Sequence, residues 1–442
     1  MPDPADSTLI EPLIHLCTSD VAGKLRGKAV PAALADEGGD LVVGWTPTNV
    51  QITCFDTIAE SPFGALGDLL LTGDPATRAR VDFGDGGVIE DFVIGDVTHL
   101  DGRAWECCTR SILKAALERL KASAGLTLFG AFEHEFHLPE RRGGRGEGYA
   151  FGAFRSERRL LETIMAALRQ AGIEPDSIMK EYGPNQFEVV VKPTQGHAIA
   201  DQAAVLREIV RATGERLERR VSFAPLVEPA GIGNGVHVHL SFRDEQGKPA
   251  TYDADGPNGM GAATASFVAG VLRHLPAIVA FLAPSVVSYE RLIPHRWSAA
   301  FNNLGAQDRE AAVRLCPIRD PAKTAEQFNI EVRACDAAAS PHLALAAIVH
   351  AGTAGIEAGL AAPEATAEDL SLLSEPDLQA RNLRRLPDSL AAALDELEAA
   401  ADVCAWFPEG FCEVYLAHKR DEIVTLQGRD AEALCRAYQE AY

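Results

Sequence analysis

The sequence predicts an α+β protein in two parts, a small β-rich N-terminal domain over residues 1–100 and a larger α/β domain over residues 101–442. Three observations support this fold class. Short strand-like pieces separated by glycine turns fill the first part, and strands alternate with amphipathic helices in the second. Four strands of the second part also carry polar side chains on one face and apolar side chains on the other, as neighbours in one half-buried sheet would.

Composition excludes several classes of protein. The 442 residues are 47% hydrophobic and 24% charged, as in an ordinary globular protein, and the net charge of −22 argues against a nucleic-acid or anionic-membrane surface. The first residues show no signal-peptide pattern, and the apolar stretch Leu275–Val287 is short and interrupted by Pro276 and Pro284. Nine cysteines without CxxC spacing indicate reduced thiols. We therefore expect a cytoplasmic protein without a membrane span.

The first part and its junction contain several predicted elements. Strands are expected at Leu41–Val43 and Gln51–Phe55, and Asp56 follows the second of them. A helix is expected over Ala104–Ser123. Arg141–Gly148 is expected to be a flexible loop and not a phosphate cradle, because no helix follows it immediately.

The second part alternates strands with amphipathic helices. The expected strands, besides the one discussed next, are Gln186–Val191, Gly235–Phe242 and Asn329–Arg333. The expected helices are Glu157–Ala171, His197–Arg219, Ala262–Leu282, His342–Gly359 and Leu386–Ala401.

The strand Phe129–Leu138 is the centre of the candidate site. Side-chain alternation puts Glu133, Glu135 and His137 on one face. Two carboxylates that point the same way from an apolar strand repel each other and favour a bound cation. A solvated edge strand explains this stretch equally well by itself. The repetition of the pattern in three later strands favours the cation.

The later strands add carboxylates, imidazoles and arginines. Glu188 follows Glu181 by seven residues, His237 shares a face with His239, and Glu331 shares a face with Arg333. Carboxylate-rich sites with few nitrogen ligands suit Mg²⁺ or Mn²⁺ and not Zn²⁺. Arginines suit carboxylate and phosphate, and the cluster comprises Arg291, Arg309, Arg314 and Arg333. Together these residues predict a phosphoryl-transfer site where an acid meets a nucleotide.

Gly231, Gly233 and Gly235 have the spacing of a dinucleotide-binding turn. A strand and not a helix follows them, so we reject that interpretation.

Several motifs, in order over roughly residues 100–360, resemble the glutamine synthetase family. They are EHEFHL, KEYGPNQFEV, GNGVHVHLSF, SYERLIP, QDREAAVRLCP and IEVRACDAAASPHLALAA, and HLCTSDVAGKLRGKAVP resembles the start of the family's N-terminal domain. The resemblance implies a β-grasp N-terminal domain and a catalytic domain whose curved antiparallel sheet forms a metal-binding funnel. It also implies a ring-shaped homo-oligomer, a dodecamer, with active sites shared between neighbouring subunits.

The resemblance implies a role for each motif residue. One metal would be held by Glu135, Glu181 and Glu188, and another by Glu133, His237 and Glu331. The nucleotide and the transferred phosphate would be bound by His239, Arg309 and Arg314, and the acid by Arg291, Arg333 and Gly233. The catalytic residues would be Asp56, Arg309 and Glu331. The family reaction uses ATP as co-substrate and two or three Mg²⁺ or Mn²⁺ ions per site. It activates the γ-carboxylate of glutamate as γ-glutamyl phosphate, which a nitrogen nucleophile then attacks.

Departures from the family pattern affect the nucleophile and the acid. Trp297 stands where glutamine-forming enzymes place a glutamate that closes the ammonium site, and Asp56 in FDTI is the nearest equivalent of the aspartate in their DGSSI loop. Ile232 replaces an asparagine that holds the amino end of glutamate, which leaves the identity of the acid open. No counterpart of the adenylylation segment is evident.

We therefore interpret the chain as a γ-glutamyl–amine ligase in which the Trp297 indole forms an apolar wall for a substituted amine. Simple packing of Trp297 in a loop is the alternative for that residue. For the whole chain the alternatives are an ammonia-using glutamine synthetase and a catalytically silent structural or regulatory member of the family.

Overall fold

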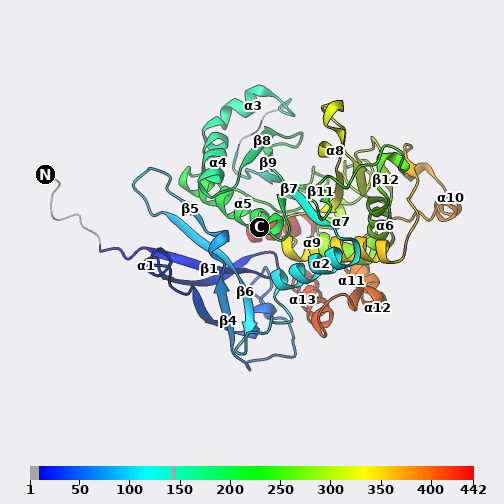
Figure 1. Cartoon of the computed structure of the whole chain (residues 1–442). Coiled ribbons are helices and arrows are strands. Elements are labelled where there is room, and N and C mark those ends of the chain that lie inside the picture. Colours follow the sequence, from blue (N-terminus) through cyan, green and yellow to red (C-terminus); the bar gives the residue numbers. More distant parts are fainter. Residues whose placement is uncertain (1–8, 142, 144–145) are drawn as a thin grey trace.

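The computed structural model describes residues 9–141, 143 and 146–442 and contains two sheets, one in each part of the chain (Figure 1). The first sheet has six strands in the order β2-β1-β6-β4-β3, with β5 paired to β6. Its elements are β1 (Leu13–Ser19), β2 (Leu25–Pro31), α1 (Ala33–Asp36), β3 (Val42–Trp45), β4 (Leu69–Gly73), β5 (Ala79–Val81) and β6 (Glu90–His99). The β-rich character expected of the N-terminal part is therefore confirmed.

The second sheet has nine strands in the order β15-β12-β13-β14-β11-β7-β9-β8, with β10 paired to β7. They are β7 (Thr127–His137), β8 (Pro175–Lys180), β9 (Gln186–Val191), β10 (Thr194–Gln195), β11 (Val236–Arg243), β12 (Leu304–Gly305), β13 (Val313–Leu315), β14 (Ile330–Cys335) and β15 (Ala365–Thr366). The central pairs are antiparallel as expected, whereas β12 pairs in parallel with β13 and β15. The sheet is therefore mixed.

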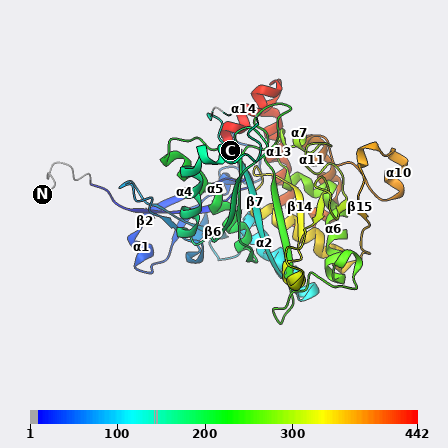
Figure 2. The ribbon, with the colours of Figure 1, turned by 90° about the horizontal axis from the view of Figure 1, so that it is seen from above.

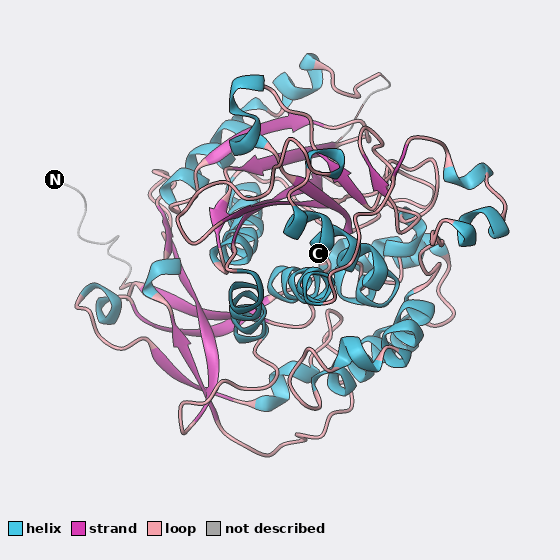
Figure 3. Ribbon diagram, turned by 45° about the vertical axis from the view of Figure 1, so that its right-hand side comes forward, coloured by secondary structure: helices cyan, strands magenta, loops and turns pink. Residues whose placement is uncertain are grey.

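Helices cover this sheet and close the core, and Figure 3 shows the sheet curving over several of them. The longer ones are α2 (Thr109–Ala124), α4 (Arg158–Gln170), α5 (Ala198–Arg216), α6 (Ala262–Leu282), α9 (Pro341–Glu357), α11 (Leu390–Ala399), α13 (Phe411–Leu426) and α14 (Ala431–Ala441). The shorter ones are α3 (Phe151–Ser156), α7 (Ser288–Arg291), α8 (Thr324–Gln327), α10 (Glu375–Ala380) and α12 (Ala401–Cys404). The apolar face of the sheet is buried, with Phe136, Phe187 and Val238 fully inaccessible.

The two parts lie side by side (Figure 2) and meet at a buried arginine of α2. Arg110 pairs with Asp74 at 2.6 Å and Asp96 at 2.9 Å from the first part, and with Asp201 of α5 at 3.0 Å. A buried guanidinium is stable only when its charge is paired, so this contact fixes how the parts join.

The apolar helix α6 has the bounds that the sequence predicts, and it runs without a break through Pro276. Proline cannot donate to the carbonyl four residues earlier, and the Asn302 side chain donates to that carbonyl, of Leu272, at 3.3 Å. In the part of the chain that the structure describes, α6 is the one helix with the length and apolarity to cross a membrane, and 78% of its apolar window is buried inside the protein. It is therefore a core helix.

The expected strand Gln51–Phe55 was wrong. Its first residue ends the 3-10 helix Pro47–Gln51, and the chain then turns back on itself, because Ile52 bridges Ile58 and the Thr53 N–H donates to the Thr57 carbonyl at 3.0 Å. The following loop rests on α13, where Asp421 accepts a hydrogen bond from Thr57 Oγ1 at 2.7 Å. This anchored loop carries Asp56. Part of the expected flexible loop Arg141–Gly148 lies outside the described residues.

Candidate active site

The four polar-faced strands are neighbours in the second sheet, and their register brings the polar side chains together. Glu133 lies opposite His237, Glu135 opposite Glu188, and His239 opposite Glu331. These six side chains define what we call the site face. Their neighbours along each strand point into the core, which is why the donors cannot turn away from one another.

One donor group on the site face consists of Glu133, His237 and Glu331. His237 Nδ1 lies 3.3 Å from Glu133 Oε2 and 3.4 Å from Glu331 Oε1, and one donor atom from each residue lies within 4.8 Å of the others. Burial by itself would raise the pKa of Glu133, but hydrogen bonds with His237 and His239 hold that pKa well below its usual range. The lowered pKa favours the ionised carboxylate, which is the form that can accept a cation.

A second donor group consists of Glu135, Glu188 and His237, again within 4.8 Å. Burial, with the charge of Glu181 next, raises the pKa of Glu135 to about 8. Burial, with the charge of Glu133 next, raises the pKa of Glu188 to about 9. Crowded carboxylates that hold protons at neutral pH in the absence of a counter-charge are the donors that a divalent cation would satisfy.

Glu181, which the family resemblance adds to this group, follows β8 and lies outside the close set of donor atoms. Its Oε2 accepts a hydrogen bond from the Tyr182 backbone N–H at 2.9 Å. It acts on Glu135 through its charge.

Binding of Mn²⁺ to the metal-free protein is expected to release protons, because Glu135 and Glu188 must ionise to become ligands. Isothermal titration calorimetry in two buffers of different ionisation enthalpy should show release of about one to two protons per site near pH 7 and less toward pH 9. A carboxyl whose pKa is higher in the folded state favours folding at low pH. The metal-free protein should therefore lose stability as pH rises from the unfolded value toward the folded pKa values. The Glu188→Gln variant is the matched control and should release fewer protons; identical heats in both buffers would contradict the prediction.

Two arginines contact the first donor group, and a third lies buried nearby. Arg314 Nη1 lies 2.9 Å from Glu331 Oε2, and Arg333 pairs with the other oxygen of Glu331. Arg291 is buried and donates to Ser298 Oγ at 2.9 Å and to the Cys335 carbonyl at 2.7 Å. A Cβ atom on Gly233 would lie 2.7 Å from the Arg291 side chain, so glycine is required for this close approach.

Besides Glu181, three residues that the sequence analysis placed at the site do not join the cluster in this chain. Arg309 is exposed on the loop between β12 and β13, and its charge acts on Tyr149. The Asp56 side chain is 88% exposed in the N-terminal part, with Arg26 at 3.9 Å. His137 ends the same row as Glu133 and Glu135, but it is buried and its Nδ1 pairs with Asn234 Oδ1 at 2.8 Å.

Three polar residues of the site were missed by the sequence analysis. Gln186 Nε2 donates to Glu135 Oε2 at 3.0 Å, Asn329 Oδ1 lies 2.9 Å from His239 Nδ1, and Cys316 Sγ lies 3.5 Å from the same nitrogen. Each stands two positions from a predicted site residue, namely Glu188, Glu331 and Arg314. The alternation rule that identified Glu188 and Glu331, if applied to Arg314 as well, could therefore have found all three.

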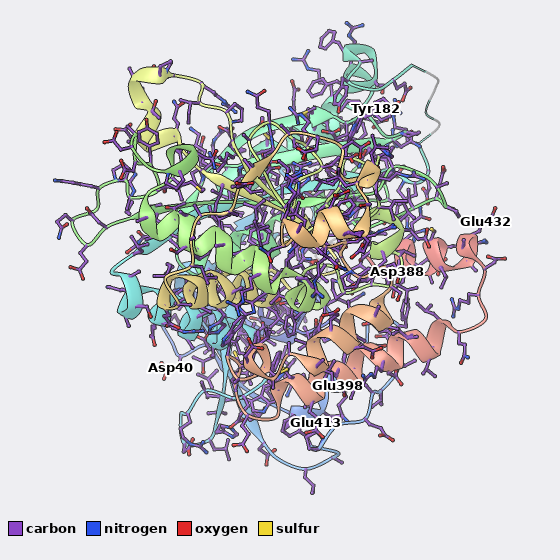
Figure 4. The ribbon with its side chains drawn as sticks, turned by 90° about the vertical axis from the view of Figure 1, so that its right-hand side faces the viewer. Asp40, Tyr182, Asp388, Glu398, Glu413 and Glu432 are labelled. Atoms are coloured by element: carbon purple, nitrogen blue, oxygen red, sulfur yellow. The ribbon has the colours of Figure 1, made fainter. Side chains whose placement is uncertain are left out.

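Aromatic side chains lie next to the site face. Trp297 is 47% exposed and packs its ring edge-to-face on Tyr182, with centroids 4.7 Å apart. The Trp297 backbone N–H donates to Glu310 Oε1 at 3.0 Å, and its carbonyl accepts from Arg333 at 3.2 Å. Figure 4 shows Tyr182 near the upper edge of the molecule. Trp297 is thus connected through Arg333 to Glu331.

A mixed sheet that gathers carboxylates, imidazoles and guanidinia on one face defines a class of metal-dependent enzyme that handles phosphate. Comparison with known proteins makes this class specific. Residues 106–438 match the glutamine synthetase catalytic domain, and residues 5–105 match the glutamine synthetase N-terminal domain. The chain belongs to the glutamine synthetase family. It is an ATP-dependent ligase that forms carbon–nitrogen bonds, and enzymes of this family use divalent metals.

Individual relatives agree with this assignment. The gamma-glutamylpolyamine synthetase GlnA3 of Streptomyces coelicolor is 31% identical over 97% of this chain and 93% of its own length. A glutamine synthetase of Methanocaldococcus jannaschii is also 31% identical, over 84% of this chain and 82% of its own. A crystal structure described as a novel glutamine synthase homolog has a TM-score of 0.89 and 38% identity and covers 99% of this chain and 100% of its own.

Proposed function

We propose that the enzyme joins the γ-carboxylate of glutamate to an amine larger than ammonia, through a γ-glutamyl phosphate intermediate formed from ATP. The observation that carries this proposal is Trp297, an exposed indole beside the site face. In glutamine-forming enzymes the equivalent position holds a carboxylate, which attracts ammonium. An indole instead offers apolar contact to the substituent of an amine.

The surroundings of Trp297 favour a side chain that is held in place as a wall of the amine pocket and not one that moves freely. Its φ angle is +52°, a conformation that a bulky residue adopts only when its surroundings fix it. Glu310 and Arg333 hold its backbone on both sides, and the Tyr182 ring packs against the indole. Two aromatic faces held in place can bury a methylene chain, each methylene contributing about 0.8 kcal/mol.

The first and second donor groups fit Mg²⁺ or Mn²⁺, because they consist of carboxylates with a single shared imidazole, that of His237. Such ions supply charge that offsets the negative oxygens of the transferred phosphoryl group. In our proposal, Arg314 and Arg309 bind the oxygens of the nucleotide and of the transferred phosphoryl group, and His239 lies beside them. Arg291 and Arg333 bind the carboxylates of the acid. Ile232 leaves open whether a related acid can replace glutamate.

The similarity to the Streptomyces coelicolor gamma-glutamylpolyamine synthetase also supports an amine as nucleophile. The experiment that tests the proposal measures phosphate release with ATP, glutamate and a panel of amines against ammonium. Two buried methylenes predict a kcat/KM at least about tenfold higher for an alkyl amine or polyamine than for ammonium. A preference for ammonium would support the glutamine synthetase alternative, and no release with any nucleophile would support a catalytically silent protein.

We further propose a cytoplasmic, ring-shaped homo-oligomer, a dodecamer, whose sites are completed by Asp56 of a neighbouring subunit. Asp56 has a φ angle of +59° and an exposed side chain on a loop anchored to α13. The Asp56 carboxylate is therefore exposed, has a strained backbone and lies away from the metal-donor groups of its own chain. A carboxylate in this position is suited to complete the site of another subunit. The nine free thiols agree with a reducing compartment.

Mixed assembly tests the shared site. The Asp56→Ala and Glu331→Ala subunits should each be inactive alone, but co-expressed they should recover about a quarter of wild-type phosphate release, since random neighbours complete that share of sites. The control is each variant co-expressed with itself. No recovery from mixed particles of confirmed composition would show that each site lies within one chain.

A further inference from the structure

A third donor group on the site face differs in chemistry from the other two. Cys316 Sγ lies 3.5 Å from His239 Nδ1 and 3.8 Å from Glu331 Oε2, and one donor atom from each residue lies within 4.8 Å of the others. The three residues come from separate segments, namely β11, β14 and the residue after β13. The group contains a sulfur, a nitrogen and an oxygen.

The separations match the geometry of a tetrahedral metal centre. With metal–sulfur bonds of about 2.3 Å and metal–nitrogen or metal–oxygen bonds of about 2.0 Å, adjacent sulfur and nitrogen or oxygen ligands lie about 3.5 Å apart. The observed 3.5 and 3.8 Å need little adjustment. Asn329 Oδ1, 2.9 Å from the same His239 nitrogen, stands where a further oxygen contact can form.

Ligand softness selects the ion. Thiolate and imidazole favour Zn²⁺ and similar thiophilic ions, whereas Mg²⁺ and Mn²⁺ prefer oxygen. Cys316 and His239 are both half-buried, so an ion can reach them from solvent. Seven of the nine cysteines are buried, and Cys404, the other partly exposed one, directs its thiol to the Leu397 carbonyl.

We propose that Cys316, His239 and Glu331 form a site for a thiophilic divalent ion such as Zn²⁺, which shares Glu331 with the first donor group, and that the bound ion inhibits the enzyme. On binding, the Cys316 thiol gives its proton to solvent and the sulfur coordinates the ion. Glu331 Oε2 is held by Arg314 at 2.9 Å, so an ion on that oxygen displaces the guanidinium. Only the inhibitory effect rests on the proposed function. In that function Arg314 binds phosphate and Glu331 binds Mg²⁺ or Mn²⁺, and the thiophilic ion withdraws both residues from these roles.

Cobalt binding tests the site directly. The full-length protein titrated with Co²⁺ should develop the near-ultraviolet absorption of a thiolate–cobalt bond, and Zn²⁺ should abolish it. The Cys404→Ser protein should behave like wild type, whereas Cys316→Ser should lose the absorption and bind Zn²⁺ at least about tenfold more weakly in competition with a chromophoric chelator. Absorption retained in Cys316→Ser, or absent from wild type, would overturn the site.

Inhibition is measured on each variant relative to its own rate without Zn²⁺, in excess Mg²⁺. The Zn²⁺ concentration that halves phosphate release should rise at least about tenfold in Cys316→Ser and stay unchanged in Cys404→Ser. Equal sensitivity of both variants would overturn the inhibitory role. A protein that binds Co²⁺ through Cys316 but releases no phosphate with any amine would instead count against the proposed function.

Discussion

Replacing Glu331 by alanine is expected to reduce phosphate release from ATP at least about 100-fold, which corresponds to roughly 3 kcal/mol of lost transition-state stabilisation. Glu331 is buried, and it contacts His237, Arg314 and Arg333. Its removal empties one donor group and leaves two guanidinium groups without their carboxylate. Glu135→Ala should have a similar effect, because it removes a ligand from the second donor group.

The control separates lost chemistry from lost structure. Glu413 is exposed on α13, and Figure 4 shows it at the opposite end of the molecule from Tyr182, so Glu413→Ala should release phosphate at the wild-type rate. Size-exclusion chromatography with light scattering should show the same assembly for all variants. Glu331→Ala and Glu135→Ala rates within tenfold of wild type would contradict the assignment of the metal ligands.

Replacing Trp297 by glutamate is expected to lower the ratio of kcat/KM for amine over ammonium by about one to two orders of magnitude. The estimate combines roughly two methylenes of lost contact with the loss of about 0.5–2 kcal/mol of attraction between a cationic nitrogen and the ring. The new carboxylate should also attract ammonium. The ratio is the quantity to measure, because general damage to the site cancels in it.

Matched variants distinguish the ring from the loop. Trp297→Phe keeps an aromatic face and should lower the ratio less than Trp297→Glu. Tyr182→Ala removes the ring that packs on the indole and should lower the ratio in the same direction. An unchanged ratio in Trp297→Glu would place Trp297 outside the amine pocket and favour the glutamine synthetase alternative.

The period-two pattern was sufficient to predict which strands share a sheet. Phe132 and Phe136 alternate with Glu133 and Glu135. A half-buried strand can bury the two phenylalanines only by turning both glutamates to its other face. The β11 and β14 strands follow the same rule. The predicted ends of the four site strands were within two residues of the observed ends, and α6 was predicted at its observed bounds, Ala262–Leu282.

Contacts between loops could not be predicted in this way. Tyr182 and Trp297 meet although 115 positions separate them, and no periodicity links the two loops. The group that compensates for the missing N–H of Pro276 is a second example, because the Asn302 side chain comes from another segment. The three missed polar residues are a different case, because the alternation rule could have identified them but was not extended to their positions. They are Gln186, Asn329 and Cys316.

The division between strands and loops at the site has a consequence for how such an enzyme can change. Each donor on β7, β11 and β14 alternates with a core residue, so inserting one residue there would exchange the two faces and destroy both. Trp297 and Tyr182 stand in connecting segments, where length and composition tolerate variation. Selection for a new nucleophile can therefore act on the loops while phosphate activation is inherited intact. Libraries that randomise residues around these two positions should yield altered amine preference far more often than loss of ATP use.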